Sequence, residues 1–505
     1  MTALYIGIDC GTQGTKAVLL KQGSSQIIAE AYKEHSLEED AQGKREQDPL
    51  MWVEAVKHVI GQVIQKSAIN PREIKGIGVS GQQHGMVALD KKDRVIRPAK
   101  LWCDTSTTKQ AEALTQKLGG EKAVIDCIGN SIAVGFTASK LLWLKENEPE
   151  NYQNLTTVLL PHDYINFWLT GQKVAEIGDA SGTAYFDVRK REWSQKVINS
   201  IDSSGQLLAC LPPLATYNEG IGFVRSEVAA IFGLSADVLV SPGGGDNMMA
   251  AIGTGNVASG VVTASIGTSG TIYGFSETPV VDAQGEVAAF CSSEGHWLPL
   301  VCTMNATVSS ELTRNLLNKS LLEFNALLES APVGAEGVVC LPFFNGERTP
   351  ALPQGKASFH GIDSSNFTPS NMCRASVEGA SYGLRYGLDA LKRNDLNPRQ
   401  VRLTGGGSKS KVWREVIANV FECEVVSPII EEAGAWGAAL QALWCQQNQT
   451  NKVSIKEITD EYVSLNQESR VVPDEKKSEQ YQENYQNYLS LVQQMYPKLS
   501  NKQES

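Results

Sequence analysis

The sequence predicts an α/β protein with two similar domains, each containing a β-sheet with flanking helices. The chain of 505 residues is too long to fold around one hydrophobic core. Runs of β-prone apolar residues alternate with helical patterns, which is typical of layered α/β folds. A Gly-Thr-x-Gly-Thr motif also occurs twice, at residues 11–15 and 267–271. This repeat indicates that the two halves of the chain are related.

Both copies of the motif are expected to form turns between two strands. The apolar runs 4–8 and 17–20 flank the first copy, and the runs 261–266 and 271–275 flank the second. Chance recurrence of a short motif rich in small residues is the alternative.

The domain boundaries follow from the position of the two motifs. We expect one domain at residues 1–250 and the other at 251–467. The glycine-rich segment 241–247 is the expected junction and hinge. Residues 468–505 are polar, and we expect a tail that forms a surface helix with a frayed end.

Other local patterns place helices and strands around these motifs. A helix is expected to start at Asp48, an N-cap residue, with Pro49 as its first residue, because apolar residues then recur at helical spacing over 52–64. The remaining expected elements are a strand at 74–80, helices at 371–393 and 410–421, and an apolar, glycine-rich segment at 401–407.

The composition indicates which classes of binding partner are disfavoured and in which compartment we expect the protein. The formal net charge of -11 disfavours nucleic acid and anionic membranes, which require a concentrated basic surface. It does not exclude a nucleotide, because backbone N–H groups and a divalent metal can hold phosphate. The ten cysteines show no zinc-binding or redox spacing. With an N-terminus unlike a secretory signal and no apolar run of 18 residues, we expect a cytoplasmic protein without a membrane partner.

The glycine turns suit phosphate binding, because residues without a Cβ allow the backbone N–H groups to approach phosphate oxygens. Asp9 ends the strand before the first turn, where one carboxylate is sufficient to hold a hydrated Mg²⁺; an ordinary turn residue is the alternative.

Residues 402–410 offer a third glycine platform, which does not match a Walker A motif. The string Gly-x-Gly-x-x-Gly at 76–81 lies within an expected strand and is not interpreted as a dinucleotide site.

Several polar residues are candidates for the substrate site. Asp246 lies between glycines and Asn247 near the expected junction; an Asx-turn or a helix N-cap is the alternative. His84 is expected in a loop at the end of a strand, where a structural role is the alternative. Trp102 and Asp104 together resemble a sugar site, because they combine an apolar ring with a hydroxyl acceptor.

Together, and in their order along the chain, these motifs resemble those of the carbohydrate kinase family that includes glycerol, gluconate, ribulose and xylulose kinases. The resemblance extends from Tyr5 to about Trp444 and rests on two phosphate hairpins, at 7–12 and 266–270, and an adenosine segment at 403–407. It implies two actin-like (ribonuclease H-like) domains, each a mixed β-sheet flanked by helices, with an interdomain cleft that closes over the substrates.

Other segments resemble the xylulose-kinase branch of that family. They are Gly81-Gln-Gln-His-Gly85, Leu160-Pro-His-Asp-Tyr164 (where the branch has Leu-Pro-Lys-Asp-Tyr), and residues 178–183, 243–247 and 346–350. Two departures alter the expected pocket wall: the bacterial pattern has Met at the position of Gln83 and Asn at the position of Cys103.

The resemblance implies a role for each matching residue. Asp246 matches the general base, and Asp9 matches the carboxylate for phosphate and metal. The implied sugar contacts are Gln83, His84, Trp102, Asp104, Asp246 and Asn247. The implied ATP contacts are Thr12, Gln13, Gly267, Thr268, Ser269, Gly405, Gly406 and Ser408. Arg348 matches a family motif, but the sequence leaves a structural ion pair and a catalytic role equally open.

The implied activity is the Mg²⁺-assisted transfer of phosphate from ATP to D-xylulose, with Asp246 as the base for the 5-hydroxyl group. A kinase of another ketose or polyol, such as ribulose, fuculose, gluconate or glycerol, is the first alternative. An actin-like ATPase that acts on proteins is a more distant one. The sequence leaves the oligomeric state open, with a homodimer as one candidate.

Overall fold

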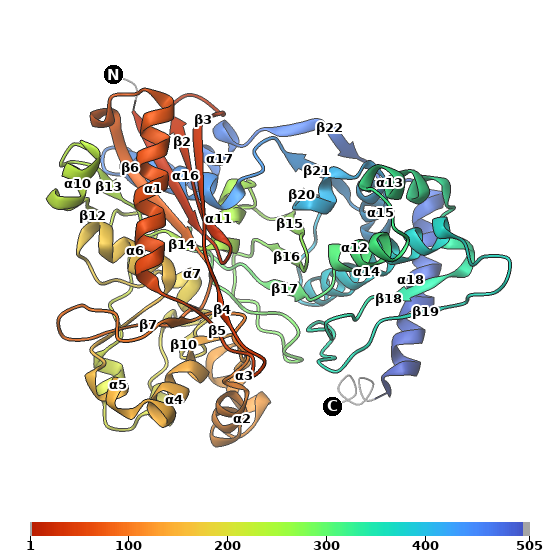
Figure 1. Ribbon diagram of the computed structural model, residues 1–505, viewed down its shortest axis with the longest axis horizontal. Helices are drawn as coiled ribbons and strands as arrows, with labels where there is room; N and C mark the ends of the chain where they lie inside the picture. Colours follow the sequence, from red (N-terminus) through yellow and green to blue (C-terminus); the bar gives the residue numbers. More distant parts are fainter. Residues whose placement is uncertain (1–2, 498–505) are drawn as a thin grey trace.

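The computed structural model describes residues 3–497 and contains two lobes, each with its own β-sheet (Figure 1). In the first lobe the strand order is β3-β2-β1-β6-β13-β12. β1 pairs antiparallel with β2 and parallel with β6, so the N-terminal hairpin lies at the centre of the sheet. These strands are β1 (Leu4–Cys10), β2 (Gly14–Lys21), β3 (Ile27–Glu34), β6 (Ile74–Gly81), β12 (Gly222–Phe223) and β13 (Leu239–Val240).

The second sheet repeats this arrangement. Its order is β17-β16-β15-β20-β21-β22, and each strand pair has the same relative direction as its counterpart in the first sheet. The prediction of two similar domains, each containing a glycine-turn hairpin, is therefore confirmed. These strands are β15 (Val261–Ile266), β16 (Gly270–Gly274), β17 (Leu300–Thr303), β20 (Gln400–Thr404), β21 (Glu424–Pro428) and β22 (Leu465–Val471).

Helices from distant parts of the chain pack on the first sheet. Helix α1 (Pro49–Ser67) begins after Asp48, whose carboxylate accepts the Leu50 N–H, and it buries Trp52, as predicted. Helix α16 (Ala433–Asn448) comes from late in the chain, yet it packs on β1 and β6 in the first lobe (Figure 1). A Cβ atom at Gly78 of β6 would lie 2.0 Å from the Ala438 carbonyl oxygen, so only glycine permits this close contact.

A group of helices lies below the first sheet in Figure 1. Its own hydrophobic core includes Leu114, Leu141 and Ile198. The helices are α2 (Thr108–Lys117), α3 (Glu121–Ile128), α4 (Thr137–Asn147), α5 (Pro149–Asn154) and α8 (Gln195–Ile201). Two further helices lie closer to the first sheet: α6 (Pro161–Thr170) packs on β6 and α1, and α7 (Ile177–Ala180) contacts the segment 244–245.

Helices α12 (Thr307–Leu316), α13 (Leu321–Ser330), α14 (Pro369–Arg393) and α15 (Lys411–Phe421) belong to the second lobe (Figure 1). The predicted C-terminal helix is α18 (Glu475–Met495), and it packs against α14 and α15. It buries Tyr481, Tyr485 and Tyr488 in the core of that lobe, so the polar tail contributes to the second domain.

The segment 241–247, expected as a hinge, belongs to the first lobe. Its residues Gly244–Gly245 form β14, which pairs with β6. Helix α11 (Asp246–Gly253) follows directly and packs against α16. The segment is thus anchored on both sides. Among residues 3–497, no helix has the length and apolar character needed to cross a membrane.

Candidate active site

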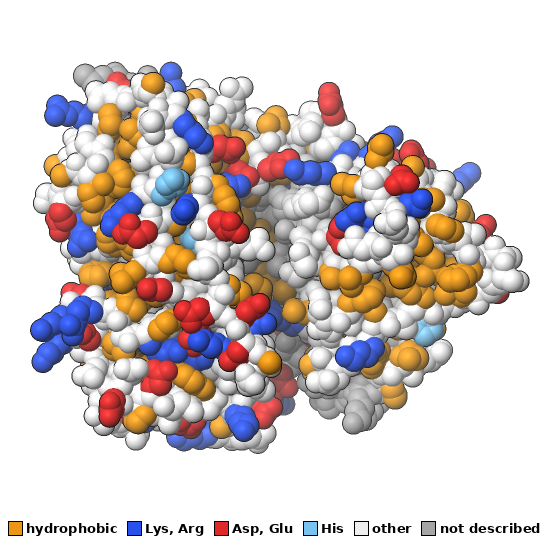
Figure 2. Space-filling model, in the orientation of Figure 1, with side chains coloured by type: hydrophobic (Ala, Val, Ile, Leu, Met, Phe, Trp, Pro, Cys, Tyr) orange, Lys and Arg blue, Asp and Glu red, His pale blue; other side chains and the backbone are white. Residues whose placement is uncertain are grey.

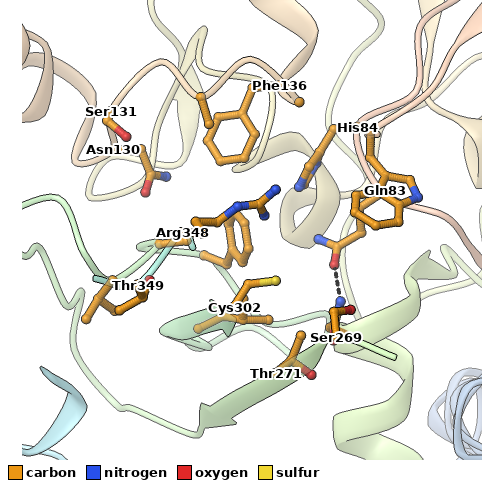
Figure 3. Close-up of a pocket in the computed structure, with 18 of the residues that line it drawn as sticks. Gln83, His84, Asn130, Ser131, Phe136, Ser269, Thr271, Cys302, Arg348 and Thr349 are labelled. Carbon is orange, nitrogen blue, oxygen red and sulfur yellow. Dashed lines mark hydrogen bonds between the residues drawn. The ribbon is translucent and has the colours of Figure 1, made fainter. Parts of the chain in front are cut away.

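A cavity of about 420 Å³ lies between the lobes, where the surface is hollowed in Figure 2. Both halves of the chain line it (Figure 3). Residues predicted from the sequence that reach it are Gln83, His84, Trp102, Asp246, Asn247, Gly267, Ser269 and Arg348. The structure therefore brings five of the six expected sugar residues and part of the second glycine turn into one space.

Asp246 is positioned by the start of α11. Gly245 occupies the N-cap position, and no side chain caps the helix, so the interpretation of Asp246 as an N-cap does not apply. Its Oδ1 accepts the Asn247 backbone N–H at 2.8 Å and the Asn247 Nδ2–H at 2.9 Å. Among the described residues no hydrogen bond reaches Oδ2 of Asp246. This oxygen can therefore accept a proton from a molecule in the cavity.

The electrostatic environment of Asp246 suits a base. Burial, and then the negative charge of Asp9, raise the pKa of the Asp246 carboxyl to about 7. The two hydrogen bonds from Asn247 oppose this shift. A carboxylate with this pKa can both take up and release a proton near neutral pH.

The polar wall of the cavity is formed by Gln83 and His84, which follow β6. Gln83 Oε1 accepts the Asn247 Nδ2–H at 2.6 Å, and this bond links it to α11 (dashed in Figure 3). The His84 ring packs against Phe136 and Phe290, with centroid distances of 4.9 and 5.4 Å. The site thus offers polar groups for hydroxyls beside an apolar wall.

Trp102 connects this wall to the first glycine turn. Its Nε1–H donates to Thr12 Oγ1 at 2.9 Å, and the Thr12 hydroxyl donates to Gln82 at 3.0 Å. Gln13 is exposed in the same turn and lies outside the cavity lining.

The structure does not bring Asp104 into the cavity. Its side chain is fully buried, and both oxygens accept hydrogen bonds from protein groups. Lys100 Nζ lies 3.3 Å from Oδ2 and forms an ion pair with it. The structure therefore assigns Asp104 to the support of the loop behind Trp102. Cys103 is also absent from the lining, whereas Gln83, the other departure from the family pattern, is part of it.

Asp9 is the second-last residue of β1, beside the first glycine turn, one residue before the strand end rather than at it as predicted. Its Oδ1 accepts the Ser80 hydroxyl at 2.6 Å. Burial raises the pKa of the Asp9 carboxyl, and no Lys, Arg or His among residues 3–497 forms an ion pair with it. A half-buried carboxylate that forms no ion pair fits a site for a divalent cation. No cluster of three acidic, His or Cys ligands occurs in the described part, but Mg²⁺ needs only one or two carboxylates.

The second glycine turn is fixed by the start of α12. The carbonyl groups of Gly267 and Thr268 accept the N–H groups of Thr307 and Ala306 at 2.9 and 3.0 Å. Gly267 and Ser269 line the cavity, whereas Thr268 does not.

The third glycine platform lines a second cavity of about 460 Å³. Gly405, Gly406 and Ser408 all contribute to it. Gly405 has φ +82°, and a Cβ atom there would lie 2.6 Å from the Ile266 carbonyl oxygen, so this platform rests directly on the strand before the second turn. Gly267, the residue after Ile266, lines the first cavity, so the third platform and the second turn lie side by side.

The structure separates the roles of Glu347 and Arg348. Glu347 is buried and accepts the Met304 N–H at 2.6 Å and the Asn305 Nδ2–H at 3.0 Å, so it is the structural residue of this motif. Arg348 is exposed in the cavity lining, and within the described residues its guanidinium group forms no ion pair (Figure 3).

Sequence reasoning did not select two residues behind His84. Asp179 is fully buried, and its carboxylate lies 2.8 Å from His84 Nδ1. His162 is also fully buried, and its Nδ1 lies 3.3 Å from Asp179. Both residues lie in segments that resemble those of xylulose kinases, but no local pattern indicated that these segments meet.

Residues 4–253 match the N-terminal domain, and residues 262–445 the C-terminal domain, of the FGGY family of carbohydrate kinases. The chain belongs to this family. It is 46% identical over 498 residues to a xylulose kinase of Haemophilus influenzae, covering 98% of this chain and 100% of that protein.

Solved structures of this family have the same fold. A crystal structure of a xyloylose kinase from Brucella ovis superposes with a TM-score of 0.90 at 30% identity and covers 99% of both chains. A gluconate kinase from Lactobacillus acidophilus gives a TM-score of 0.90 at 24% identity over 98% of both chains, which shows the shared fold alone. The predicted actin-like fold with two domains is therefore confirmed.

Proposed function

We propose that this chain transfers the γ-phosphoryl group of ATP to the 5-hydroxyl group of D-xylulose, giving D-xylulose 5-phosphate and ADP. The observation that carries the proposal is the open Oδ2 of Asp246 in a cavity that both lobes line. The xylulose kinase relatives favour this sugar, whereas the fold shared with a gluconate kinase keeps another ketose or polyol as the alternative.

In this mechanism Asp246 accepts the proton of the attacking hydroxyl. The bond between the sugar oxygen and the γ-phosphorus forms as the bond from that phosphorus to the bridging oxygen breaks, and ADP leaves. Gln83, His84, Trp102 and Asn247 orient the sugar so that its hydroxyl faces the γ-phosphorus. Closure of the lobes excludes water, which would otherwise be phosphorylated in place of the sugar.

The glycine turns position ATP. The turn containing Thr12 and Gln13 and the turn 267–269 lie on the phosphate side, and Gly405, Gly406 and Ser408 lie on the adenosine side. Asp9 would hold Mg²⁺, which supplies neutralising charge to the phosphate oxygens when bound. We place the reaction in the cytoplasm, as the sequence predicts.

A substrate panel tests the choice of sugar. We expect kcat/KM, measured by ADP release with MgATP, to be highest for D-xylulose among D-xylulose, D-ribulose, L-fuculose, gluconate and glycerol. A higher value for any of the others would reject the sugar and leave the kinase assignment intact.

Arg348 is proposed to contact the phosphoryl group from the second lobe. A hydrogen bond from a charged group contributes about 1.5–3 kcal/mol, so Arg348→Ala should lower kcat/KM by about 10- to 100-fold. Arg348→Lys keeps the charge and should recover part of this loss. If the alanine variant retained full activity but melted at a lower temperature, the role of Arg348 would instead be structural.

A further inference from the structure

Behind His84 the structure contains three buried titratable side chains that the proposed mechanism does not use. They form a chain that runs from His84 through Asp179 and His162 to Asp163, away from the cavity. The last three side chains are at most 1% exposed. Burying these side chains costs free energy of folding, because charged groups lose their hydration inside a protein.

Asp179 holds both the backbone and the ring of His84. Its Oδ1 accepts the His84 backbone N–H at 3.1 Å and lies 2.8 Å from His84 Nδ1. The His84 backbone has φ +60°, a region that residues other than glycine rarely adopt. Such a conformation persists only where its surroundings enforce it. The carboxylate of Asp179 therefore fixes where the His84 ring lies.

The contact with Asp179 also determines the tautomer of His84. A carboxylate only accepts hydrogen bonds, so the proton of the neutral ring resides on Nδ1. Nε2 is then left as an acceptor. In this form His84 can accept a hydrogen bond from a sugar hydroxyl.

His162 in turn holds Asp179. Its Nδ1 lies 3.3 Å from Asp179 Oδ2, and its Nε2 lies 2.9 Å from Asp163 Oδ1. When Asp163 and Asp179 are both ionised, each ring nitrogen faces an acceptor, so both carry protons and the ring is an imidazolium. Burial raises the pKa of the Asp163 carboxyl, and the positive charge of His162 opposes that shift. Burial opposes this charge, but Asp163 and Asp179 outweigh burial and raise the pKa of His162 well above its usual value.

The other titratable groups facing this chain are Glu176, Tyr185, Lys140 and Asp246, whose pKa the charge of Asp179 helps to raise. Glu176 accepts the backbone N–H groups of Gly178 and Asp179, and burial raises its pKa to about 7. Burial raises the pKa of Tyr185 far above neutral, so it remains uncharged. Lys140 contributes a weaker attraction to Asp179. None of these groups replaces the two protons that His162 supplies.

We propose that His162 is a positioning residue for sugar binding: as an imidazolium ion it orients Asp179, which holds His84 with its acceptor nitrogen towards the sugar. The proposal rests on the proposed sugar site. The direction in which sugar binding changes with pH follows from the charge of His162. The charged form is complete at low pH and is lost as pH rises through the raised pKa of His162, so sugar binding should weaken on the alkaline side.

Two substitutions at His162 test this. His162→Gln removes the charge at every pH, and a displaced catalytic or binding group can cost up to about 10²-fold. We expect kcat/KM for the sugar to fall by about 10- to 100-fold, with no alkaline decline left and the KM for MgATP unchanged. His162→Lys keeps a positive charge and should retain more activity, with the alkaline decline moved to higher pH. His58→Gln, on the exposed face of α1, is the matched control and should match the wild type.

A spectroscopic measurement keeps the test valid if the variants do not fold. In ¹⁵N-labelled wild-type protein, one of the six histidines should remain an imidazolium at pH 8, and this signal should be absent in His162→Gln. A neutral ring at pH 8 would overturn the proposal. So would a His162→Gln variant with the wild-type pH profile on the best sugar of the panel. Failure of the proposed function would appear differently, as a wild-type enzyme that does not turn over D-xylulose.

Discussion

Replacing Asp246 with asparagine is expected to lower kcat by about 10² to 10⁴, the usual contribution of a positioned base. The amide keeps the shape of the side chain but cannot take the hydroxyl proton. Affinity for MgATP should remain near normal, because the proposed mechanism assigns the Asp246 carboxylate to the sugar and not to ATP. Measuring kcat together with ATP binding checks both expectations.

The melting temperature separates this role from a structural one. The pKa of Asp246 in the folded protein is raised, so the carboxyl favours folding at low pH, and this contribution is lost as pH rises through about 7. Asp246→Asn should therefore melt at the same or a higher temperature than the wild type at pH 8. An unchanged kcat would eliminate the base role, and a lower melting temperature would mean that Asp246 supports the fold.

Asp9→Asn should lower kcat by about 10² to 10³, the loss typical of a group that stabilises charge in the transition state. The KM for the sugar should change little, because Asp9 lies at the phosphate turn. Asp237→Asn is the matched control, since Asp237 is exposed and pairs with Lys75 on the surface. Wild-type turnover by Asp9→Asn across a range of Mg²⁺ concentrations would show that Asp9 has no role in metal binding.

The same variant should change the pH profile. In the wild type, kcat/KM should rise with pH through about 7 as Asp246 loses its proton. The charge of Asp9 is one cause of that raised pKa, so Asp9→Asn should move the rise to lower pH. An unmoved profile would mean that Asp246 does not control it.

The duplicated fold could be predicted because its signal is local. Each Gly-Thr-x-Gly-Thr turn lies between two apolar runs, and Asp48 with Pro49 marks the start of α1. The packing of α16 on the first sheet could not be predicted, because it depends on contacts between distant parts of the chain. The docking of α18 had a signal, since Tyr481, Tyr485, Tyr488 and Val492 recur at helical spacing, but polar neighbours obscured it.

The site was predictable to a similar extent. Asp9, His84 and Asp246 stand at the ends of strands or beside glycine turns, where loops place functional groups. Asp104 looked equivalent in sequence, but Lys100 and the backbone of Arg45 and Ser106 occupy its carboxylate. Asp179 and His162 could not be selected, because their importance depends on a buried contact between α6 and α7.

The most direct test is a ³¹P NMR time course of the wild-type protein with ATP, Mg²⁺ and D-xylulose. The proposed function predicts one ADP for each new sugar phosphate ester, with the phosphate on the 5-hydroxyl oxygen and negligible ADP formation without the sugar. ADP and free phosphate forming at the same rate with or without the sugar would contradict it.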